Sequence, residues 1–478
     1  MLHLRSCQSK GNMESLMRYQ LRDFVEETTF SRELDIEAIA GAVPKPVIEE
    51  VLNQMDALEQ RERKLNMVQV IFILISMNLF AHLSIGDTIR KVAQGLRFVW
   101  DDPDYPVPKA NALSYRRYQL GAKPLVSLFH SVCNPVATPQ TQGAFLFGLR
   151  LMAIDATVED APDTPENVAA FGKPSASRGE AAFPQVKGVY LVECGTHAII
   201  DAGFWPCRVS ERVGAVRMLR SLQPDMLVMW DRGLHDFDMF VGARNHGAHV
   251  LSRLPSYVKP AKVHSLCDGS YVAYIYPSEY KRRRKGEAML VRIIEYTLTD
   301  PALPGYGEVH RLITTLLDPK ACPALDLVCA YHERWEVEIT IDEIDTHQRL
   351  CPRTLRSLKP VGVIQELYAL LIGHYAVRSL IHDAACQAEV DPDRISFVHA
   401  LRVIQDAIPE FQMVAPESHP QLHSRLLRDI ASGLLPERRN RTNPRVVKRK
   451  MSNFHLKREE HRQWPQPSVP FRQAVALI

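Results

Sequence analysis

The chain has 478 residues, of which 46% are apolar and 24% are charged. This composition excludes a disordered or fibrous chain and can supply the cores of about two to four globular domains. The net charge of +3 neither requires nor excludes a nucleic-acid partner, because binding depends on how charges are distributed locally. The nine cysteines form no CxxC pair, which argues against a disulfide framework or a zinc knuckle and indicates a reducing cytoplasm.

The N-terminal part of the chain is expected to be helical. Its first residues lack the basic, apolar and small-residue order of a signal peptide, so we expect no export. Apolar residues recur at helical spacing from residue 47 to residue 133, and the Pro-containing break DDPDYPVPKANAL separates two groups of helices. We therefore predict an α-helical N-terminal domain over residues 1–140.

One segment of this domain is nearly long enough to cross a membrane. It runs from Met67 to Ile85, and four polar residues interrupt it, namely Gln69, Ser76, Asn78 and His82. A spanning helix needs about 20 predominantly apolar residues, so we interpret the segment as a buried core helix. A membrane span is the weaker alternative.

From Phe145 the apolar residues alternate with a period of two, which is typical of strands. The expected strands are FGLRLMAIDAT, KGVYLVEC and HAIIDAGFW, followed by a helix, the strand DMLVMW, a second helix and the strand HVLSRL. This order of elements matches a ribonuclease H-like sheet, and the ECGT break between the second and third runs suits a hairpin turn. We predict an α/β fold in which the sheet domain covers residues 141–385.

Two further regions complete the predicted organisation. Residues 255–324 contain β-like stretches and read as a β-rich insertion in the sheet domain, with the basic turn KRRRK at Lys281 to Lys285. Helix returns at ALDLVCAYHERWEVEITIDEIDTHQRL. Residues 386–478 are predicted to form a helical, basic C-terminal region.

Three acidic residues stand where a two-metal site for phosphodiester chemistry needs carboxylates. Asp155 and Asp231 end apolar strands, and Glu338 lies on the later helix. Two divalent ions about 3.5 to 4 Å apart can activate the attacking oxygen and stabilise the leaving one, and Mg²⁺ favours carboxylate ligands. A single aspartate at a strand end is more often a turn former, so the joint placement carries the hypothesis.

Tyr331, Arg334 and Glu338 follow one another at steps of three and four residues, so they share one face of a helix. Arg334 can grip a DNA phosphate in two places, and Tyr331 can stack on a base or donate to the backbone beside the site. The alternative is a solvated face on which Arg334 and Glu338 form an ordinary ion pair.

These residues resemble a known family. YHERWEVE is similar to the Tyr, two residues, Arg, three residues, Glu signature of the insertion-sequence-4 family of DDE transposases, and WDRG and IDAT resemble the family's two aspartate motifs. The resemblance extends from about Val47 to Phe454. It implies that Asp155, Asp231 and Glu338 are the catalytic metal ligands of a ribonuclease H-like core holding two Mg²⁺ ions, with Mn²⁺ as an alternative.

The resemblance also implies a substrate and partners. The activity would be cut-and-paste transposition, in which water attacks at the element end and the freed 3′ hydroxyl attacks target DNA. The partners would be double-stranded DNA, in the form of terminal inverted repeats and target, and a second copy of the chain, with no membrane involved. The N-terminal domain would bind the DNA ends, and the protein would lie in the cytoplasm on the nucleoid.

One position departs from the family pattern. The signature continues to a lysine thought to contact DNA phosphate, but this chain has Asp345 there. A negative charge beside the DNA backbone would repel it, so either Arg349 substitutes for the lysine or this copy is impaired. The alternative function is therefore a catalytically inactive, transposase-derived DNA-binding protein.

The tail after Glu437 is densely basic and includes Lys448, Arg449 and Lys450. Each basic side chain that meets a phosphate releases counterions, so we expect these residues to bind DNA. A basic tail can also serve only to keep a chain in solution, and that alternative remains open.

Overall fold

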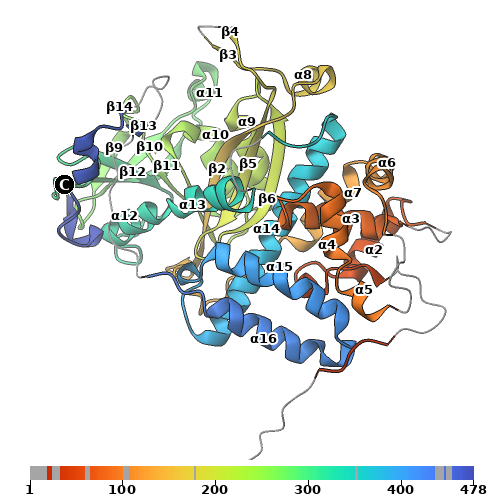
Figure 1. Ribbon diagram of the computed structural model, residues 1–478. Helices are drawn as coiled ribbons and strands as arrows, with labels where there is room; N and C mark the ends of the chain where they lie inside the picture. Colours follow the sequence, from red (N-terminus) through yellow and green to blue (C-terminus); the bar gives the residue numbers. More distant parts are fainter. Residues whose placement is uncertain are drawn as a thin grey trace, which may run out of the picture.

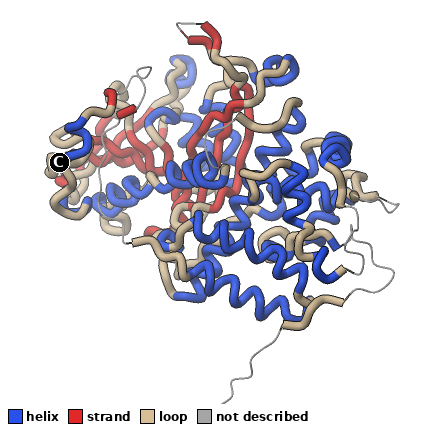
Figure 2. The backbone as a smooth tube through the Cα atoms, viewed as in Figure 1, coloured by secondary structure: helices blue, strands red, loops and turns tan. Residues whose placement is uncertain are grey.

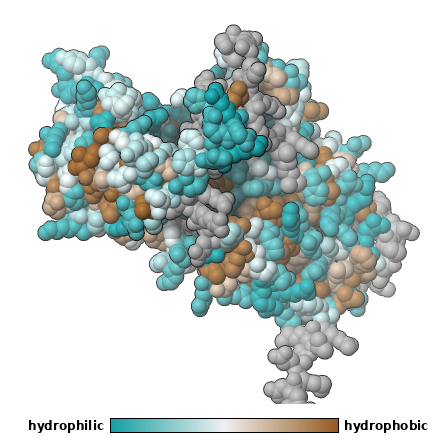
Figure 3. Space-filling view, turned by 60° about the vertical axis from the view of Figure 1, so that its left-hand side comes forward, coloured by the Kyte–Doolittle hydropathy of each residue, from teal (hydrophilic) through white to brown (hydrophobic). Residues whose placement is uncertain are grey.

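The computed structural model describes residues 19–23, 33–59, 65–100, 107–176, 179–349, 354–436, 446–447 and 455–478. Its architecture is mixed α/β, with one large sheet and a helical body packed beside it (Figure 1). Figure 2 shows the strands gathered on one side of the molecule and helices covering the other. Figure 3 shows a hollow between the lobe at the far end of the sheet and the remaining surface.

The first half of the sheet has the predicted order of elements. Strand order is β6-β5-β2-β7-β8, and the strands are β2 (Leu149–Asp160), β5 (Gln185–Glu193), β6 (Ala198–Pro206), β7 (Met226–Trp230) and β8 (His249–Arg253). β2 runs antiparallel to β5 and β5 to β6, whereas β7 is parallel to β2 and β8 is parallel to β7. Every residue of β7 is buried, as expected of a central parallel strand covered on both faces.

The helices between these strands follow the prediction. α9 (Glu211–Met218) joins β6 to β7, and α10 (Phe237–Asn245) joins β7 to β8. Each begins at a side-chain cap, Ser210 for α9 and Asp236 for α10, which satisfies a backbone N–H that has no partner inside the helix.

The β-rich region prolongs the same sheet and does not form a separate one. Its strands are β9 (Ala261–Ser265), β10 (Tyr271–Ile275), β11 (Met289–Leu298) and β12 (His310–Thr314), and β12 pairs with β8. The KRRRK segment forms the short helix α11 (Tyr280–Arg284), so the predicted basic turn was wrong. The predicted helical C-terminal region also needs correction, because β15 (Val475–Leu477) pairs with β11 at the edge of this sheet.

The N-terminal part is a bundle of short helices, as predicted. They are η1 (Glu37–Ile39), α2 (Lys45–Gln54), α3 (Met67–Leu79), α4 (Ile85–Val92), α5 (Leu96–Val99), α6 (Ala110–Leu120) and α7 (Lys123–Val132). All residues of α3 are buried, and its polar Ser76 and Asn78 donate to the carbonyls of Phe72 and Leu74. Among the described residues no helix is long and apolar enough to cross a membrane, so α3 is a core helix.

α14 (Pro360–Ala388) connects the bundle to the sheet. This 29-residue helix is buried along most of its length and packs against α3, α7 and β6. It is followed by α15 (Phe397–Met413) and α16 (His419–Ala431), which lie below it in Figure 1. The short elements that remain are β1 (Phe145–Leu146), α8 (Pro165–Phe171), β3 (Ser175–Ala176), β4 (Gly179–Glu180), η2 (Leu219–Ser221), η3 (Arg232–Leu234), η5 (Pro392–Arg394), η6 (Pro416–Ser418), β13 (Val446–Val447), β14 (His455–Leu456), η7 (Glu459–Gln463) and η8 (Phe471–Ala474).

The helix expected from residue 324 onward is broken. It divides into α12 (Ala324–Glu333), α13 (Glu336–Asp342) and a π-helical turn, η4 (Glu343–Gln348). At the break the N–H groups of Arg334 and Trp335 donate three residues back, to Tyr331 and His332. These tighter bonds, followed by the wider π turn, change the direction of the chain at a place where such irregularities often mark functional sites.

Candidate active site

Asp155 and Asp231 lie on neighbouring parallel strands at matching positions. The last paired residues of β2 and β7 are Ala153 and Met229; Asp155 lies two residues further along β2, and Asp231 lies two residues further along the chain, directly after the end of β7. Asp155 is in the middle of β2, which continues to Asp160 against β5, so its predicted place at a strand end was wrong. The pairing of β2 with β7 nevertheless stops at Ala153, just before Asp155. The Asp155 side chain therefore lies where the two strands begin to separate.

Backbone N–H groups hold one oxygen of each aspartate. Oδ1 of Asp155 accepts from the N–H of Ala156 at 2.8 Å. Oδ1 of Asp231 accepts from Gly233 at 2.8 Å and Leu234 at 3.2 Å, so the carboxylate caps η3. These contacts fix the orientation of both carboxylates without using their second oxygens.

Arg334 joins the strand and the helix of the site. Its Nη1 lies 3.5 Å from Oδ2 of Asp155, and its Nη2 lies 3.3 Å from Oε1 of Glu338. The Arg334 side chain is only 14% exposed, whereas those of Asp155 and Glu338 are 28% and 36% exposed. The guanidinium also lies over the ring of Tyr331, whose hydroxyl donates to the carbonyl of Trp230 at 3.4 Å.

The charges of these groups act on one another. Burial raises the pKa of Asp155; the N–H of Ala156 and the Arg334 guanidinium lower it, and the nearby anions Asp231 and Glu338 raise it. Burial lowers the pKa of Arg334, but Tyr331 and the three carboxylates outweigh this effect and raise it. The structure therefore brings Asp155 and Glu338 into contact with one cationic group, and Asp231 lies near enough for its charge to act on Asp155 and Arg334.

This arrangement fits divalent metal ions. The donor set consists of carboxylate oxygens, which Mg²⁺ and Mn²⁺ prefer, at a partly exposed position. The guanidinium of Arg334 already bridges two of the carboxylates, so the site attracts a cation. The chemistry of the donor set therefore agrees with a site for divalent metal ions.

Comparison with known proteins places the chain in a family. Residues 33–130 match the family model described as insertion element 4 transposase N-terminal, and residues 146–374 match the transposase DDE domain. The chain belongs to the insertion sequence 4 family of DDE transposases. It is a DNA transposase, and the resemblance inferred from the YHERWEVE, WDRG and IDAT motifs is confirmed.

Individual proteins and one solved structure are similar to this chain to different extents. The chain is 26% identical over 446 residues to the transposase InsG for insertion sequence element IS4 of Escherichia coli K12, covering 90% of this chain and 93% of that protein. It is 28% identical over 154 residues to the putative transposase InsZ of the same organism, covering 31% of this chain and 50% of that protein. The piggyBac transposase in a synaptic complex with hairpin DNA aligns over 85% of each chain, with 12% identity and a TM-score of 0.41.

Asp345, at the position where the family resemblance implies a lysine, lies on η4 among other polar groups. The hydroxyl of Thr157 donates to it at 3.5 Å, and its Oδ1 lies 3.9 Å from Nη1 of Arg349. Burial, a hydrogen bond with Glu159 and the charge of Glu159 raise the pKa of Asp345 to about 8. The carboxyl is therefore largely protonated near neutral pH, which weakens the repulsion of DNA expected from the sequence.

The other predicted DNA contacts are placed as follows. The side chain of Arg349 is 10% exposed and forms an ion pair with Glu159. Lys448, Arg449 and Lys450 lie outside the described residues.

Three neighbouring side chains differ in their exposure. His374 and Tyr375 are buried on α14. Trp335 is 52% exposed at the break between α12 and α13.

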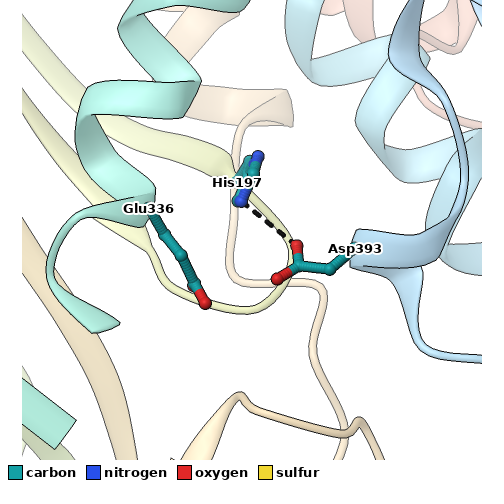
Figure 4. Close-up of side chains that lie close together, drawn as sticks. All are labelled: His197, Glu336 and Asp393. Atoms are coloured by element: carbon teal, nitrogen blue, oxygen red, sulfur yellow. Dashed lines mark ion pairs between the residues drawn. The ribbon is translucent and has the colours of Figure 1, made fainter. Parts of the chain in front are cut away.

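Sequence reasoning missed a second polar cluster in the transposase, behind α13. It contains His197, Glu336, Glu343, Arg378 and Asp393, and Figure 4 shows three of these side chains. The sequence signal that could have indicated this cluster is the spacing of Glu336 and Glu343, since residues seven apart share one face of a helix. Both carboxylates are buried, which separates them from the surface acids of the same segment.

Proposed function

We propose that this transposase cuts DNA at the ends of its own insertion element and transfers the strands to target DNA, with Asp155, Asp231 and Glu338 as ligands of two Mg²⁺ ions. The observation that carries the proposal is that Asp155 and Glu338 converge on Arg334, while Asp231 directly follows β7, the strand next to β2. Asp155 and Glu338 contact its guanidinium, and Asp231 acts on its charge. Mn²⁺ is expected to substitute, because it accepts the same oxygen ligands.

Two bound ions would activate the attacking oxygen and stabilise the leaving oxygen of an in-line displacement. The chain's own residues supply orientation. The N–H groups of Ala156, Gly233 and Leu234 hold one oxygen of each aspartate. Each aspartate would therefore hold its metal ion in a fixed direction relative to the reacting phosphate, which lowers the entropic part of the barrier.

Arg334 and Tyr331 are proposed to hold the scissile strand. A guanidinium can bind a phosphate through two parallel hydrogen bonds, and Arg334 would exchange its carboxylates for phosphate when metal ions enter. Tyr331 keeps Arg334 in place, since its ring lies under the guanidinium and its hydroxyl is fixed to the end of β7. Arg349, Lys448, Arg449 and Lys450 are proposed as further phosphate contacts.

We assign the sheet to the ribonuclease H-like class. The support is the strand order β6-β5-β2-β7-β8, with an antiparallel first half and a parallel second half. We propose residues 1–140 as the DNA-end binding domain, 141–385 as the catalytic domain with 255–324 as its β-rich insertion, and 386–478 as the C-terminal region.

The natural substrate is proposed to be double-stranded DNA with inverted repeats, and two copies of the chain would hold the two ends together. Such a complex would lie on the nucleoid in the cytoplasm, without a membrane. The exposed helix α11 carries Lys281, Arg283 and Arg284 at the edge of the β-rich extension, where basic side chains suit a phosphate backbone.

A nicking assay tests this function. Full-length protein is incubated with a duplex carrying the element end and Mg²⁺, and the cut strand and joined products are separated on a denaturing gel. We expect nicking by the natural chain, none by Asp155→Asn, and nearly full activity for Asp342→Asn. Asp342 is a suitable control because its side chain is 57% exposed on the helix that carries Glu338.

The alternative of an inactive DNA-binding protein predicts a different result. In that case the natural chain and Asp155→Asn would bind the duplex equally, and neither would nick it with Mg²⁺ or Mn²⁺. That outcome would overturn the proposal, provided that circular dichroism shows both proteins to be folded.

A further inference from the structure

A group of buried charged and polar side chains lies behind the helix that carries Glu338. His197 comes from the turn between β5 and β6, Glu336 from α13 and Asp393 from η5. His197 and Glu336 are 1% and 6% exposed, and the Asp393 side chain is 13% exposed. Charged groups are rarely buried in this way unless they are paired or coordinate a metal.

The three side chains have the geometry of a metal-binding site. One nitrogen or oxygen atom from each of His197, Glu336 and Asp393 lies within 4.8 Å of the others. Figure 4 shows them converging from separate parts of the chain, with the Glu336 and Asp393 carboxyl groups facing a common space near the imidazole. Glu336 is oriented by the N–H of Gly195, which donates to Oε2 at 2.8 Å.

The imidazole of His197 is held as metal-binding histidines usually are. Its Nδ1 lies 3.2 Å from Oε1 of Glu343 and is also in contact with Nη2 of Arg378, so these two groups occupy Nδ1 and leave Nε2 facing Asp393. Nε2 is buried 3.1 Å from Oδ1 of Asp393 and makes no aligned hydrogen bond within the described part of the chain. Glu343 is fixed in turn by Arg378 and by Nε2 of His374 at 3.2 Å.

The backbone of His197 is also unusual. Its φ of 60° lies in the left-handed region, which non-glycine residues adopt rarely and at an energetic cost. This conformation places the ring inside the molecule, in contact with η4 and η5. A strained residue that delivers a buried donor into a cluster of carboxylates is typical of a ligand site.

The cluster combines acidic and basic side chains in a buried position. Glu336, Glu343 and Asp393 bring three carboxyl groups against Arg378 and the imidazole of His197. A divalent ion bound at Nε2 of His197 would take the place of the proton that pairs the imidazole with Asp393.

We propose that His197, Glu336 and Asp393 bind one zinc ion, separate from the catalytic ions, that fixes α13 to the β5–β6 hairpin and to η5. A nitrogen donor combined with two carboxylates in a buried position suits Zn²⁺, whereas Mg²⁺ prefers oxygen ligands and retains several waters. A water molecule would complete the four ligands. Because Glu336 is two residues before Glu338, the ion would act as a positioning group for the catalytic carboxylate.

Zinc titration of the full-length chain tests the inference. The starting protein carries Asp231→Asn, which weakens the catalytic site, and it is stripped with a chelator before ZnCl₂ is added. We expect about one zinc per chain after gel filtration, measured by mass spectrometry of the metal, and a higher Tm with zinc than without. No retained zinc, or a Tm that zinc does not raise, would overturn the proposal.

Ligand variants in the same background locate the ion. Asp393→Asn and Glu336→Gln are expected to weaken zinc binding by about tenfold or more, whereas Asp383→Asn should bind as the parent does. Asp383 is a matched control, since its side chain is 52% exposed on α14. Equal zinc binding by the parent and both folded ligand variants contradicts the site. If a variant does not fold, the titration of the parent still decides whether a zinc ion binds.

Discussion

Nη1 of Arg334 lies 3.5 Å from Oδ2 of Asp155, so the cation at the end of α12 contacts a carboxylate in the middle of β2. The same guanidinium reaches Glu338 at 3.3 Å. Divalent ions and a guanidinium seek the same oxygen atoms, so metal entry requires Arg334 to give up part of these contacts. The released side chain is then free to bind a DNA phosphate, which couples metal binding to DNA binding.

Arg334→Gln should tighten metal binding in the absence of DNA. The substitution removes the competing cation, and we expect the half-saturating Mn²⁺ concentration to fall about threefold, the effect of one partly exposed ion pair. Mn²⁺ binding is measured by electron paramagnetic resonance. Arg334→Lys keeps the positive charge, so its half-saturating Mn²⁺ concentration should lie closer to that of the natural chain. Unchanged or weaker Mn²⁺ binding by Arg334→Gln contradicts the competition.

Asp345→Asn should change how stability depends on pH. The folded state keeps a proton on Asp345 up to a pKa of about 8, whereas the unfolded chain releases it near the ordinary aspartate pKa of 3.8. The natural chain is therefore expected to lose stability relative to Asp345→Asn as pH rises through this window. Urea denaturation at about pH 5, 7 and 9 measures the difference. If the free energies of unfolding of the two proteins change with pH in parallel, Asp345 is ionised in the folded state and the account is wrong.

The same pair of proteins reports on DNA binding. Near neutral pH the protonated Asp345 should repel DNA weakly, so both proteins should bind an element-end duplex with similar affinity. At about pH 9 the natural chain gains a negative charge, and its affinity is expected to fall by about threefold more than that of the variant. Fluorescence anisotropy at constant salt measures the DNA affinity of each protein at both pH values. A large advantage of Asp345→Asn already at neutral pH would contradict this account.

Arg117→Met should weaken the packing of the helical bundle against α14. The Arg117 side chain, on α6, is buried and donates to Gln365, Ser357 and the carbonyl of Gly362. Removing it leaves buried acceptors without donors, and we expect a loss of about 2 to 4 kcal/mol in the free energy of unfolding. Urea denaturation measures the loss, and Arg90→Met serves as the control because Arg90 is exposed. Equal stability of both variants would exclude Arg117 as a link between the two parts.

The carboxylates of the site could be predicted because each leaves a local signal. Asp155 and Asp231 interrupt apolar strands, and Glu338 has Tyr331 and Arg334 at helical spacing. The break at Arg334 could not be predicted, since no glycine or proline occurs between residues 324 and 349. It depends on contacts with distant strands, which local propensity does not report.

The second cluster was missed for a related reason. Glu336 and Glu343 look like surface acids, and their partners are far away in the sequence, at His197, Arg378 and Asp393. The strands of the β-rich region were visible from alternation, but their continuation of the central sheet depends on the pairing of β12 with β8. Such long-range pairing leaves no trace in a single strand.

The most direct test of the central claim is the location of metal ions in crystals of the protein with element-end DNA and Mn²⁺. We expect two anomalous peaks about 3.5 to 4 Å apart, bound by the carboxylates of Asp155, Asp231 and Glu338. Peaks located elsewhere, or carboxylates that remain apart around empty density while the DNA end is in place, would contradict the account.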